Sequence, residues 1–214
     1  MIPFARQADP ETHPRKLDLN PWHPDIVIGQ YPRTMGATSA SAALVDYVLK
    51  HFAHDELNVL ELGSGSGVIS ILLALSRKSW RITGIDIQAE LVDLAENNAR
   101  VLNPKPEFRQ ADLRSFDASC SYELVLSNPP WQKLHSGLQS PNKMRAISRM
   151  EICCTLPDMI SCCTRNLKTG GHAVLMYPSL RRTELLTAAE KNGLSLASTC
   201  ANSDHWTIFH LIKG

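Results

Sequence analysis

The spacing of hydrophobic and polar residues changes along the chain, and it predicts helices and strands that alternate. Apolar residues recur at helical spacing from Ala37 to Phe52, after which short apolar runs alternate with helical segments. The expected strands are 57–62, 80–86, 107–111, 123–127 and 172–177, and the expected helices are 68–77, 89–102, 143–167 and 181–191. Pro157 predicts a break in the longest helix, with a new helix starting there, and Gly170-Gly171 predict its end.

The last part of the chain has two strand-like runs, 194–200 and 206–212, with no helical pattern between them. They predict a closing antiparallel pair. In the earlier part a helix joins each strand to the next, which makes the strands parallel. We therefore predict an α/β fold, a Rossmann-like doubly wound sheet that is seven-stranded and mostly parallel, with a C-terminal antiparallel hairpin. Ligands of such sheets bind beyond the carboxyl ends of the strands.

Composition narrows the class of protein. The chain has 214 residues, 43% of them hydrophobic and 20% charged, which is typical of one globular α/β domain. A net charge of +1 predicts no overall attraction to nucleic acid, so a nucleic-acid substrate needs a local basic patch. We expect a Pro-rich, irregular N-terminal arm over 1–33 and a single domain over 34–214.

Neither a membrane span nor a secretion signal is visible in the sequence. No apolar run approaches the roughly 20 residues that cross a bilayer, and the N-terminus lacks the apolar core of a signal peptide. We therefore expect a cytoplasmic protein whose six cysteines are thiols. The adjacent pairs Cys153/Cys154 and Cys162/Cys163 lack C-x-x-C spacing and lie in a helical pattern, so we expect helix packing and no metal site.

A Gly-rich turn, Glu61-Leu62-Gly63-Ser64-Gly65-Ser66-Gly67, follows the strand at 57–62 and precedes a helix. Glycines permit positive φ and a close approach of backbone to ligand. The free amides at a helix N-terminus suit a carboxylate or a phosphate. The third glycine comes one position earlier than in the dinucleotide pattern G-x-G-x-x-G, which disfavours NAD. A turn without a ligand is the other alternative.

Two acidic residues close the next strands. Asp86 ends the strand at 80–86, where its carboxylate could accept both hydroxyls of a ribose. Asp112 follows the strand at 107–111, where it could accept from an adenine amino group. The alternatives are a solvated strand end for Asp86 and a turn or helix cap for Asp112.

Asn128-Pro129-Pro130-Trp131 follows the strand at 123–127, so it should share a sheet edge with the Gly-rich turn. Two prolines fix φ twice and remove two backbone donors. The Asn128 side chain and the Pro129 carbonyl could then accept the two hydrogens of an amino group. Trp131 could stack on the flat group that carries this amine.

Such an arrangement suits one kind of chemistry. The amine of a base or an amide is a weak nucleophile, because its lone pair is delocalised. Two acceptors can localise the lone pair and stabilise the charge that develops on nitrogen as it attacks a methyl group. Alignment of the reacting atoms adds to the rate. The alternative is a loop stiffened by proline that carries an ordinary tryptophan.

With both loops in place, the chain from about Thr34 onward resembles the class I methyltransferases that use S-adenosyl-L-methionine (SAM) and carry an N-P-P-aromatic motif. The resemblance implies that SAM lies on the Gly-rich turn and the two acidic strand ends. Met35-Gly36-Ala37-Thr38 looks like the family's segment that touches the SAM carboxylate. The implied cofactor-binding residues are Glu61, Gly63, Ser64, Gly65, Gly67, Asp86, Ile87, Asp112, Leu113 and Thr38, and the implied catalytic residues are Asn128, Pro129, Pro130 and Trp131.

Within that family the chain looks most like the small bacterial tRNA adenine-N6 methyltransferases. The similar segments are Ser140 with Arg145, Arg149-Met150-Glu151, and 167–171. One departure is Trp131, where those relatives usually carry Tyr or Phe. A second is that we expect no appended RNA-binding domain after the last strand.

We expect an RNA substrate, with tRNA favoured, and an RNA needs cations near the site. The predicted substrate-binding residues are Trp131, Lys133 and Arg145. Further candidate cations are His135, Lys143, Arg149, Arg181 and Arg182, although ordinary solvated charge is the alternative for all of them.

Other functions remain open. A release-factor-type protein glutamine methyltransferase shares the motif, but it typically has a helical N-terminal domain where we expect an irregular arm. Methylation of ribosomal RNA or of a small molecule fits the same residues. A catalytically inactive SAM-fold binding module is a different class, which the intact Asn128–Trp131 segment and Asp86 disfavour.

Overall fold

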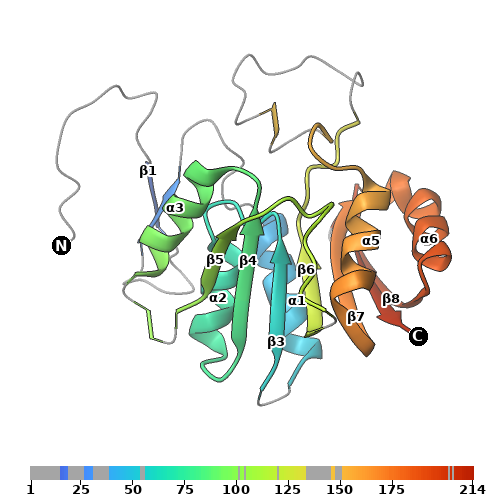
Figure 1. Cartoon of the computed structure of the whole chain (residues 1–214), viewed down its shortest axis with the longest axis horizontal. Coiled ribbons are helices and arrows are strands. Elements are labelled where there is room, and N and C mark those ends of the chain that lie inside the picture. Colours follow the sequence, from blue (N-terminus) through green and yellow to red (C-terminus); the bar gives the residue numbers. More distant parts are fainter. Residues whose placement is uncertain are drawn as a thin grey trace.

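Seven strands form one mixed sheet, in the order β5-β4-β3-β6-β7-β9-β8 (Figure 1). In the computed structural model these strands are β3 (Asn58–Leu62), β4 (Arg81–Asp86), β5 (Glu107–Gln110), β6 (Tyr122–Ser127), β7 (Leu167–Pro178), β8 (Leu194–Ala201) and β9 (Trp206–Lys213). Parallel pairs join β3 to β4 and β6, β4 to β5, and β6 to β7. The last strand, β9, is antiparallel to both β7 and β8. The predicted fold class is confirmed.

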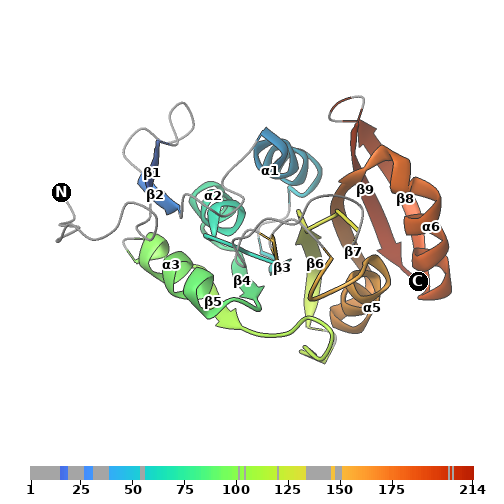
Figure 2. The ribbon, with the colours of Figure 1, turned by 90° about the horizontal axis from the view of Figure 1, so that it is seen from above.

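Helices cover both faces of this sheet (Figure 2). Their bounds are α1 (Ser39–His51), α2 (Val68–Ser76), α3 (Ala89–Ala99), α5 (Leu156–Asn166) and α6 (Arg182–Lys191), with a short 3₁₀ turn, η1 (Ser179–Arg181), before α6. The structure describes residues 15–18, 27–30, 39–53, 56–100, 102–103, 105–119, 121–133, 146–147, 151–201, 203 and 205–214. Within this part of the chain, no helix is long and apolar enough to cross a membrane.

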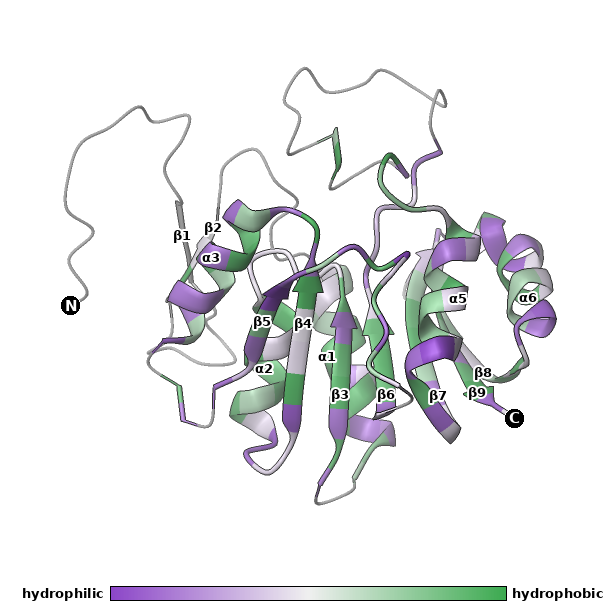
Figure 3. Ribbon diagram, viewed as in Figure 1, coloured by the Kyte–Doolittle hydropathy of each residue, from purple (hydrophilic) through white to green (hydrophobic). Residues whose placement is uncertain are grey.

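Two hydrophobic cores lie on the two faces of the sheet. One contains residues of α1, α2 and α3, and the other contains residues of α5 and α6. Successive residues of β7 alternate between them, as the two-residue period of a strand requires: Val174 and Met176 face the first core, and Ala173, Leu175 and Tyr177 face the second. Figure 3 shows hydrophobic residues concentrated on the strands in the middle of the sheet.

The prediction of one long helix over 143–167 is wrong for residues 151–155, which form turns and extended backbone. Helix α5 starts next to them, with Thr155 as its N-cap and Pro157 in its first turn. The Thr155 hydroxyl accepts from the backbone amide of Asp158, and the Asp158 carboxylate accepts from the Thr155 amide at 2.8 Å. This capping box stabilises a new helix start, and so the helix predicted to begin at Pro157 is confirmed. Cys153 and Cys154 lie in the preceding turn, not in a helix.

The predicted end of that helix at residue 167 is confirmed to within one residue, but the role predicted for Gly170-Gly171 as its stop is wrong. It ends at Asn166, and Gly170-Gly171 lie inside β7. Leu167 already pairs with Tyr122 of β6, and the register shifts before His172 resumes the pairing. This register shift is a β-bulge that requires glycine at both positions. Gly170 has φ +74, and a Cβ on Gly171 would lie 2.8 Å from the Lys168 carbonyl oxygen.

The N-terminal arm is not irregular throughout. Strands β1 (Arg15–Asp18) and β2 (Val27–Gln30) form an antiparallel pair. The pair is held to the domain by α3, because the Asn98 side chain exchanges two hydrogen bonds with the backbone of Gly29, at 2.8 and 3.0 Å. Ile28 is fully buried in the first core. Tertiary contacts therefore order two segments in which local sequence indicated no strand, while the boundary at residue 34 stays a prediction.

Candidate active site

A cavity of about 470 Å³ lies at the edge of the sheet where the parallel strands end. Its walls come from the start of α1, the turn after β3, the ends of β4 and β5, the segment after β6, and Trp206 at the start of β9. Strand β3 has β4 on one side and β6 on the other, so the strand order reverses direction at β3. This is where doubly wound sheets bind ligands.

The Gly-rich turn forms one wall. Gly63, Gly65 and Gly67 all have positive φ, at 72, 55 and 81°. Gly63 and Gly65 line the cavity, whereas Gly67 is outside its wall and precedes α2. A Cβ on Gly67 would lie 2.7 Å from the ring of Phe108, so close packing against β5 requires glycine there.

Ser64 in the same turn carries an unusual hydroxyl. Its side chain is buried in the cavity wall, and within the described residues its Oγ has no hydrogen-bond partner. A buried hydroxyl without a partner costs free energy. A polar group of a ligand seated on the turn would remove that cost, which fits the cofactor implied by the sequence.

Asp86 joins the Gly-rich turn to the end of β4. One carboxylate oxygen accepts from the Gly65 amide at 2.9 Å, and the other accepts from the Gln88 amide at 3.0 Å. Burial raises the pKa of Asp86, while these hydrogen bonds lower it. Each oxygen keeps a second lone pair, so the carboxylate can still accept from hydroxyl groups in the cavity.

Glu61, the other buried acid, lies near the end of β3. It is 2% exposed, and one of its oxygens accepts from the amide of Ser70 at 3.1 Å and from its hydroxyl at 2.5 Å. Burial raises the pKa of Glu61 to about 8, and the charge of Asp86 adds to this rise. A cationic group placed in the cavity would instead favour the ionised carboxylate.

Asp112 lines the cavity but is already paired. The Arg114 side chain donates to both of its oxygens, at 2.5 to 3.0 Å, and this hydrogen bonding lowers the pKa of Asp112. A ligand amino group would share the carboxylate with Arg114. Ile87 and Leu113, the apolar residues predicted beside the two acids, also line the cavity.

The Asn128–Trp131 segment forms another part of the cavity wall. Ser127, at the end of β6, donates its hydroxyl to the Leu62 carbonyl at 2.6 Å and so ties the segment to β3. The Asn128 amide nitrogen lies 3.4 Å from the hydroxyl of Ser41, a buried residue of α1. This contact uses an Asn128 donor and leaves its carbonyl oxygen as an acceptor for the cavity.

Trp131 packs against a residue that the motifs did not reveal. Its ring meets that of Trp206 edge to face, with centroids 5.2 Å apart and planes at 85°. Trp206 begins β9 and pairs with Pro178 at the end of β7. Because β9 runs antiparallel to β7, its first residue lies at the carboxyl edge of the sheet. The predicted hairpin could therefore have indicated Trp206 from sequence.

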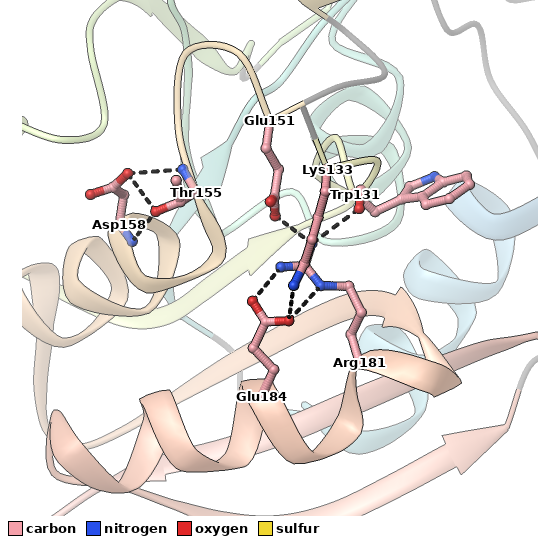
Figure 4. A network of polar contacts seen from close by, with 7 residues as sticks. All are labelled: Trp131, Lys133, Glu151, Thr155, Asp158, Arg181 and Glu184. Carbon is pink, nitrogen blue, oxygen red and sulfur yellow. Dashed lines mark hydrogen bonds and ion pairs between the residues drawn. The ribbon is translucent and has the colours of Figure 1, made fainter. Parts of the chain in front are cut away.

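The predicted cations differ in position. Lys133 is exposed and forms an ion pair with Glu184 at 2.9 Å, outside the cavity wall. Arg181, which we considered for phosphate binding, is 8% exposed and pairs with the carboxylates of Glu151 and Glu184 (Figure 4). The phosphate-binding role is therefore wrong for Arg181, because its charge is buried and neutralised. Thr38 and Arg145 lie outside the described residues.

A family model described as "Methyltransferase domain" matches residues 53–212. The chain belongs to this methyltransferase family. The match confirms the resemblance inferred from the Gly-rich turn and the Asn128–Trp131 motif.

Three known proteins illustrate how this methyltransferase domain relates to others. A release factor glutamine methyltransferase from Bacillus anthracis is 34% identical over 90 residues, which are 41% of this chain and 32% of that protein. A tRNA1(Val) (adenine(37)-N6)-methyltransferase from Phocaeicola vulgatus is 28% identical over 159 residues, 73% of this chain and 64% of that protein. The chain thus matches about a third of the first relative and just under two thirds of the second.

The solved structure of magnesium protoporphyrin IX methyltransferase from Synechocystis PCC 6803, with bound SAM, has the same fold. Its TM-score is 0.60 at 18% identity, over 81% of this chain and 78% of that one.

The raised pKa of Glu61 predicts an unusual pH dependence of stability. Between its ordinary pKa of 4.5 and the value of about 8, the folded protein binds more protons at this carboxyl than the unfolded chain does. The free energy of unfolding contributed by Glu61 is therefore lost as pH rises through this window. We expect Glu61→Gln to reduce that loss, measured by urea denaturation at pH 5.5 and 8.5 without ligand. Equal losses in both proteins would contradict the assignment, and Glu90→Gln on the exposed surface of α3 is the control.

Proposed function

We propose that this protein transfers a methyl group from SAM to the planar amino group of a base, with adenine N6 in tRNA as the favoured acceptor. The observation that carries the proposal is the placement of the Asn128–Trp131 segment and of the Gly-rich turn with Asp86 on two parts of the wall of one cavity. One part suits a cofactor, and the other suits an amine acceptor. The expected cytoplasmic location is part of this proposal.

The charges of the cavity support SAM as the cofactor. Among the lining residues, the ionisable carboxyls are Glu61, Asp86 and Asp112, and no Lys or Arg lines the described wall. SAM carries an ammonium and a sulfonium, so the field of these acids favours it over an anionic dinucleotide. Asp86 would accept from the ribose hydroxyls, and Glu61 would face the ammonium group. The Gly-rich turn, with the hydroxyl of Ser64, would take the methionine part.

The other part of the wall supports an amino group as acceptor. When bound, SAM supplies a methyl group on sulfur, which a nitrogen lone pair can attack. The Asn128 carbonyl oxygen and the Pro129 carbonyl would accept the two N–H hydrogens, localise the lone pair and stabilise the charge that develops on nitrogen. Asn128 cannot act as a base, so the proton leaves to water after the methyl group has moved. Around this segment, Trp131, Trp206 and Met159 give an uncharged surface for a flat ring.

Two acceptors compete for this site. The tRNA adenine-N6 relative favours adenine, because it aligns with 73% of this chain. The release factor glutamine relative favours an amide, because its identity of 34% is higher, although the alignment is confined to 90 residues. A glutamine amide offers the same two hydrogens but no ring to stack on Trp131. The aromatic wall formed by Trp131 and Trp206 therefore favours the base.

Methyl labelling identifies the acceptor. Purified protein and tritiated SAM are incubated with total tRNA, ribosomal RNA and protein, each prepared from cells that lack this protein. We expect label in tRNA, recovered as N6-methyladenosine after nuclease digestion. Label on a glutamine side chain would show that the substrate is a protein and not tRNA. No label in any fraction, together with measurable SAM binding, would contradict catalysis and favour an inactive binding module.

Asn128 should act in the chemical step and not in cofactor binding. Removing one hydrogen-bond donor that stabilises a developing charge typically lowers turnover about 10²–10³-fold, and we expect the loss of the Asn128 acceptor in Asn128→Ala to have an effect of similar size. The dissociation constant of SAM, measured by calorimetry, should stay close to that of the unchanged protein. Asn97→Ala, on the exposed face of α3, is the control. Undiminished turnover would refute the assigned role.

Asp86 should act in cofactor binding. A hydrogen bond to a charged group contributes about 1.5–3 kcal/mol, so Asp86→Asn should weaken SAM binding roughly 10- to 100-fold. Asp112→Asn should weaken it less, because Arg114 already occupies that carboxylate. Calorimetric titration of both variants with SAM tests this order. A larger loss for Asp112→Asn would reverse the assignment of the main polar contact.

A further inference from the structure

We infer that Arg181 is a positioning residue for methyl transfer, which holds the Asn128–Trp131 segment in its reactive position. The inference rests on the proposed function, and it adds a residue that lies outside the motifs and outside the cavity wall. Arg181 ends η1 and directly precedes α6, 50 positions after Trp131 in the chain.

The guanidinium of Arg181 binds three separate segments. One terminal nitrogen donates to the Trp131 carbonyl at 3.0 Å and to the carboxylate of Glu151. The other donates to Glu184 of α6 at 2.7 Å, and Nε donates to the second oxygen of Glu184 at 3.3 Å. Figure 4 shows these groups converging on the guanidinium. All three nitrogens are thus used, in the planar geometry that suits arginine.

The pairing is shielded from water. The side chains of Arg181 and Glu151 are 10% and 8% exposed, and the Arg181 guanidinium lies 5.5 Å from the centre of the buried Tyr177 ring. Water competes weakly with a pair at this depth, so its geometry is better defined than that of a surface ion pair. Loss of the arginine would leave Glu151 as a buried charge without its cation.

Near these contacts, the residues that follow the Asn128–Trp131 segment meet residues about 20 positions later in the chain. The Glu151 amide donates to the Gln132 carbonyl at 2.8 Å, so residues before and after the stretch 134–150 meet at this point. Lys133 adds an ion pair with Glu184. Arg181 therefore connects the described residues on either side of that stretch, Trp131 and Glu151, to α6.

Anchoring at this point matters for the reaction because the segment between the anchors is stiff. Ser127 fixes its start to β3, and Arg181 fixes its end at Trp131. Pro129 and Pro130 leave little freedom between these points. The direction of the Asn128 and Pro129 acceptors therefore depends on both anchors. A displacement of about 1 Å in such groups can cost about 10²-fold in rate.

Arg181→Lys tests this role, since lysine keeps the charge but cannot donate to three partners from one plane. We expect kcat for the tRNA acceptor to fall about 100-fold. The dissociation constant of SAM should change by less than about threefold, because the hydrogen bonds of Arg181 go to Trp131, Glu151 and Glu184 and not to a residue assigned to the cofactor. The control is Arg109→Lys, which alters an exposed arginine pair with Glu107 on β5. An unchanged kcat would overturn the proposal. A loss of turnover that disappears at saturating SAM would overturn it as well, because weaker SAM binding would then explain the loss.

Hydrogen exchange provides a readout that needs no acceptor. In Arg181→Lys, peptides that contain 128–133 and 151–155 should exchange faster, while peptides from 58–70 keep their protection. Unchanged protection at Glu151 would overturn the holding role. If no acceptor is found but these peptides loosen, the proposed function fails while the holding role stands.

A second variant covers the case in which Arg181→Lys does not fold. Glu151→Gln keeps an acceptor for Arg181 but removes the charge, so it should loosen the same two peptides and lower kcat less than Arg181→Lys would. Glu107→Gln, from the exposed pair on β5, is its control. Glu151→Gln with unchanged exchange and unchanged kcat would also overturn the proposal.

Discussion

The parallel pairing of β3 with β4 on one side and β6 on the other is the constraint on which the site depends. Leu62 and Ile85 lie in register on β3 and β4, and Glu61 is paired with Leu126 of β6. The three strands therefore end together, and the residues that follow each of them enter one cavity. Shifting any of these strands by one residue would turn its side chains to the opposite face. The Gly-rich turn, Asp86 and Asn128 would then no longer face a common space.

That cavity holds two buried acids whose burial costs free energy. Neither Glu61 nor Asp86 is paired with a cation among the contacts of the described residues; each is held by hydrogen bonds from serine or from backbone amides. Burial raises the pKa of both carboxyls, so the ionised forms are disfavoured. A cationic ligand would reverse this effect. The site thus combines reduced stability of the protein alone with selective attraction for a positively charged cofactor.

Local sequence patterns predicted most of the fold and much of the cavity. Strands and helices of this kind show their period over a few residues, and glycine and proline mark the turns between them. Where the prediction failed, contacts between distant residues decided the outcome. The Asn98 side chain forms hydrogen bonds with the backbone of Gly29, 69 positions earlier in the chain, and so orders part of the arm that was expected to be irregular. The pairing of Leu167 with Tyr122 likewise makes residues 167–171, including Gly170-Gly171, the first part of strand β7. No local pattern carries such information.

Arg181 shows the same principle in the site itself. From sequence it is one of several arginines near a strand end, and an exposed role in RNA binding suited it. The fold instead surrounds it with acceptors from three segments: Trp131, Glu151 and Glu184. A hydrophobic residue could fill this space, but it would leave the Trp131 carbonyl and the buried Glu151 carboxylate without donors. A planar cation satisfies them together, and in doing so it ties the Asn128–Trp131 segment to helix α6.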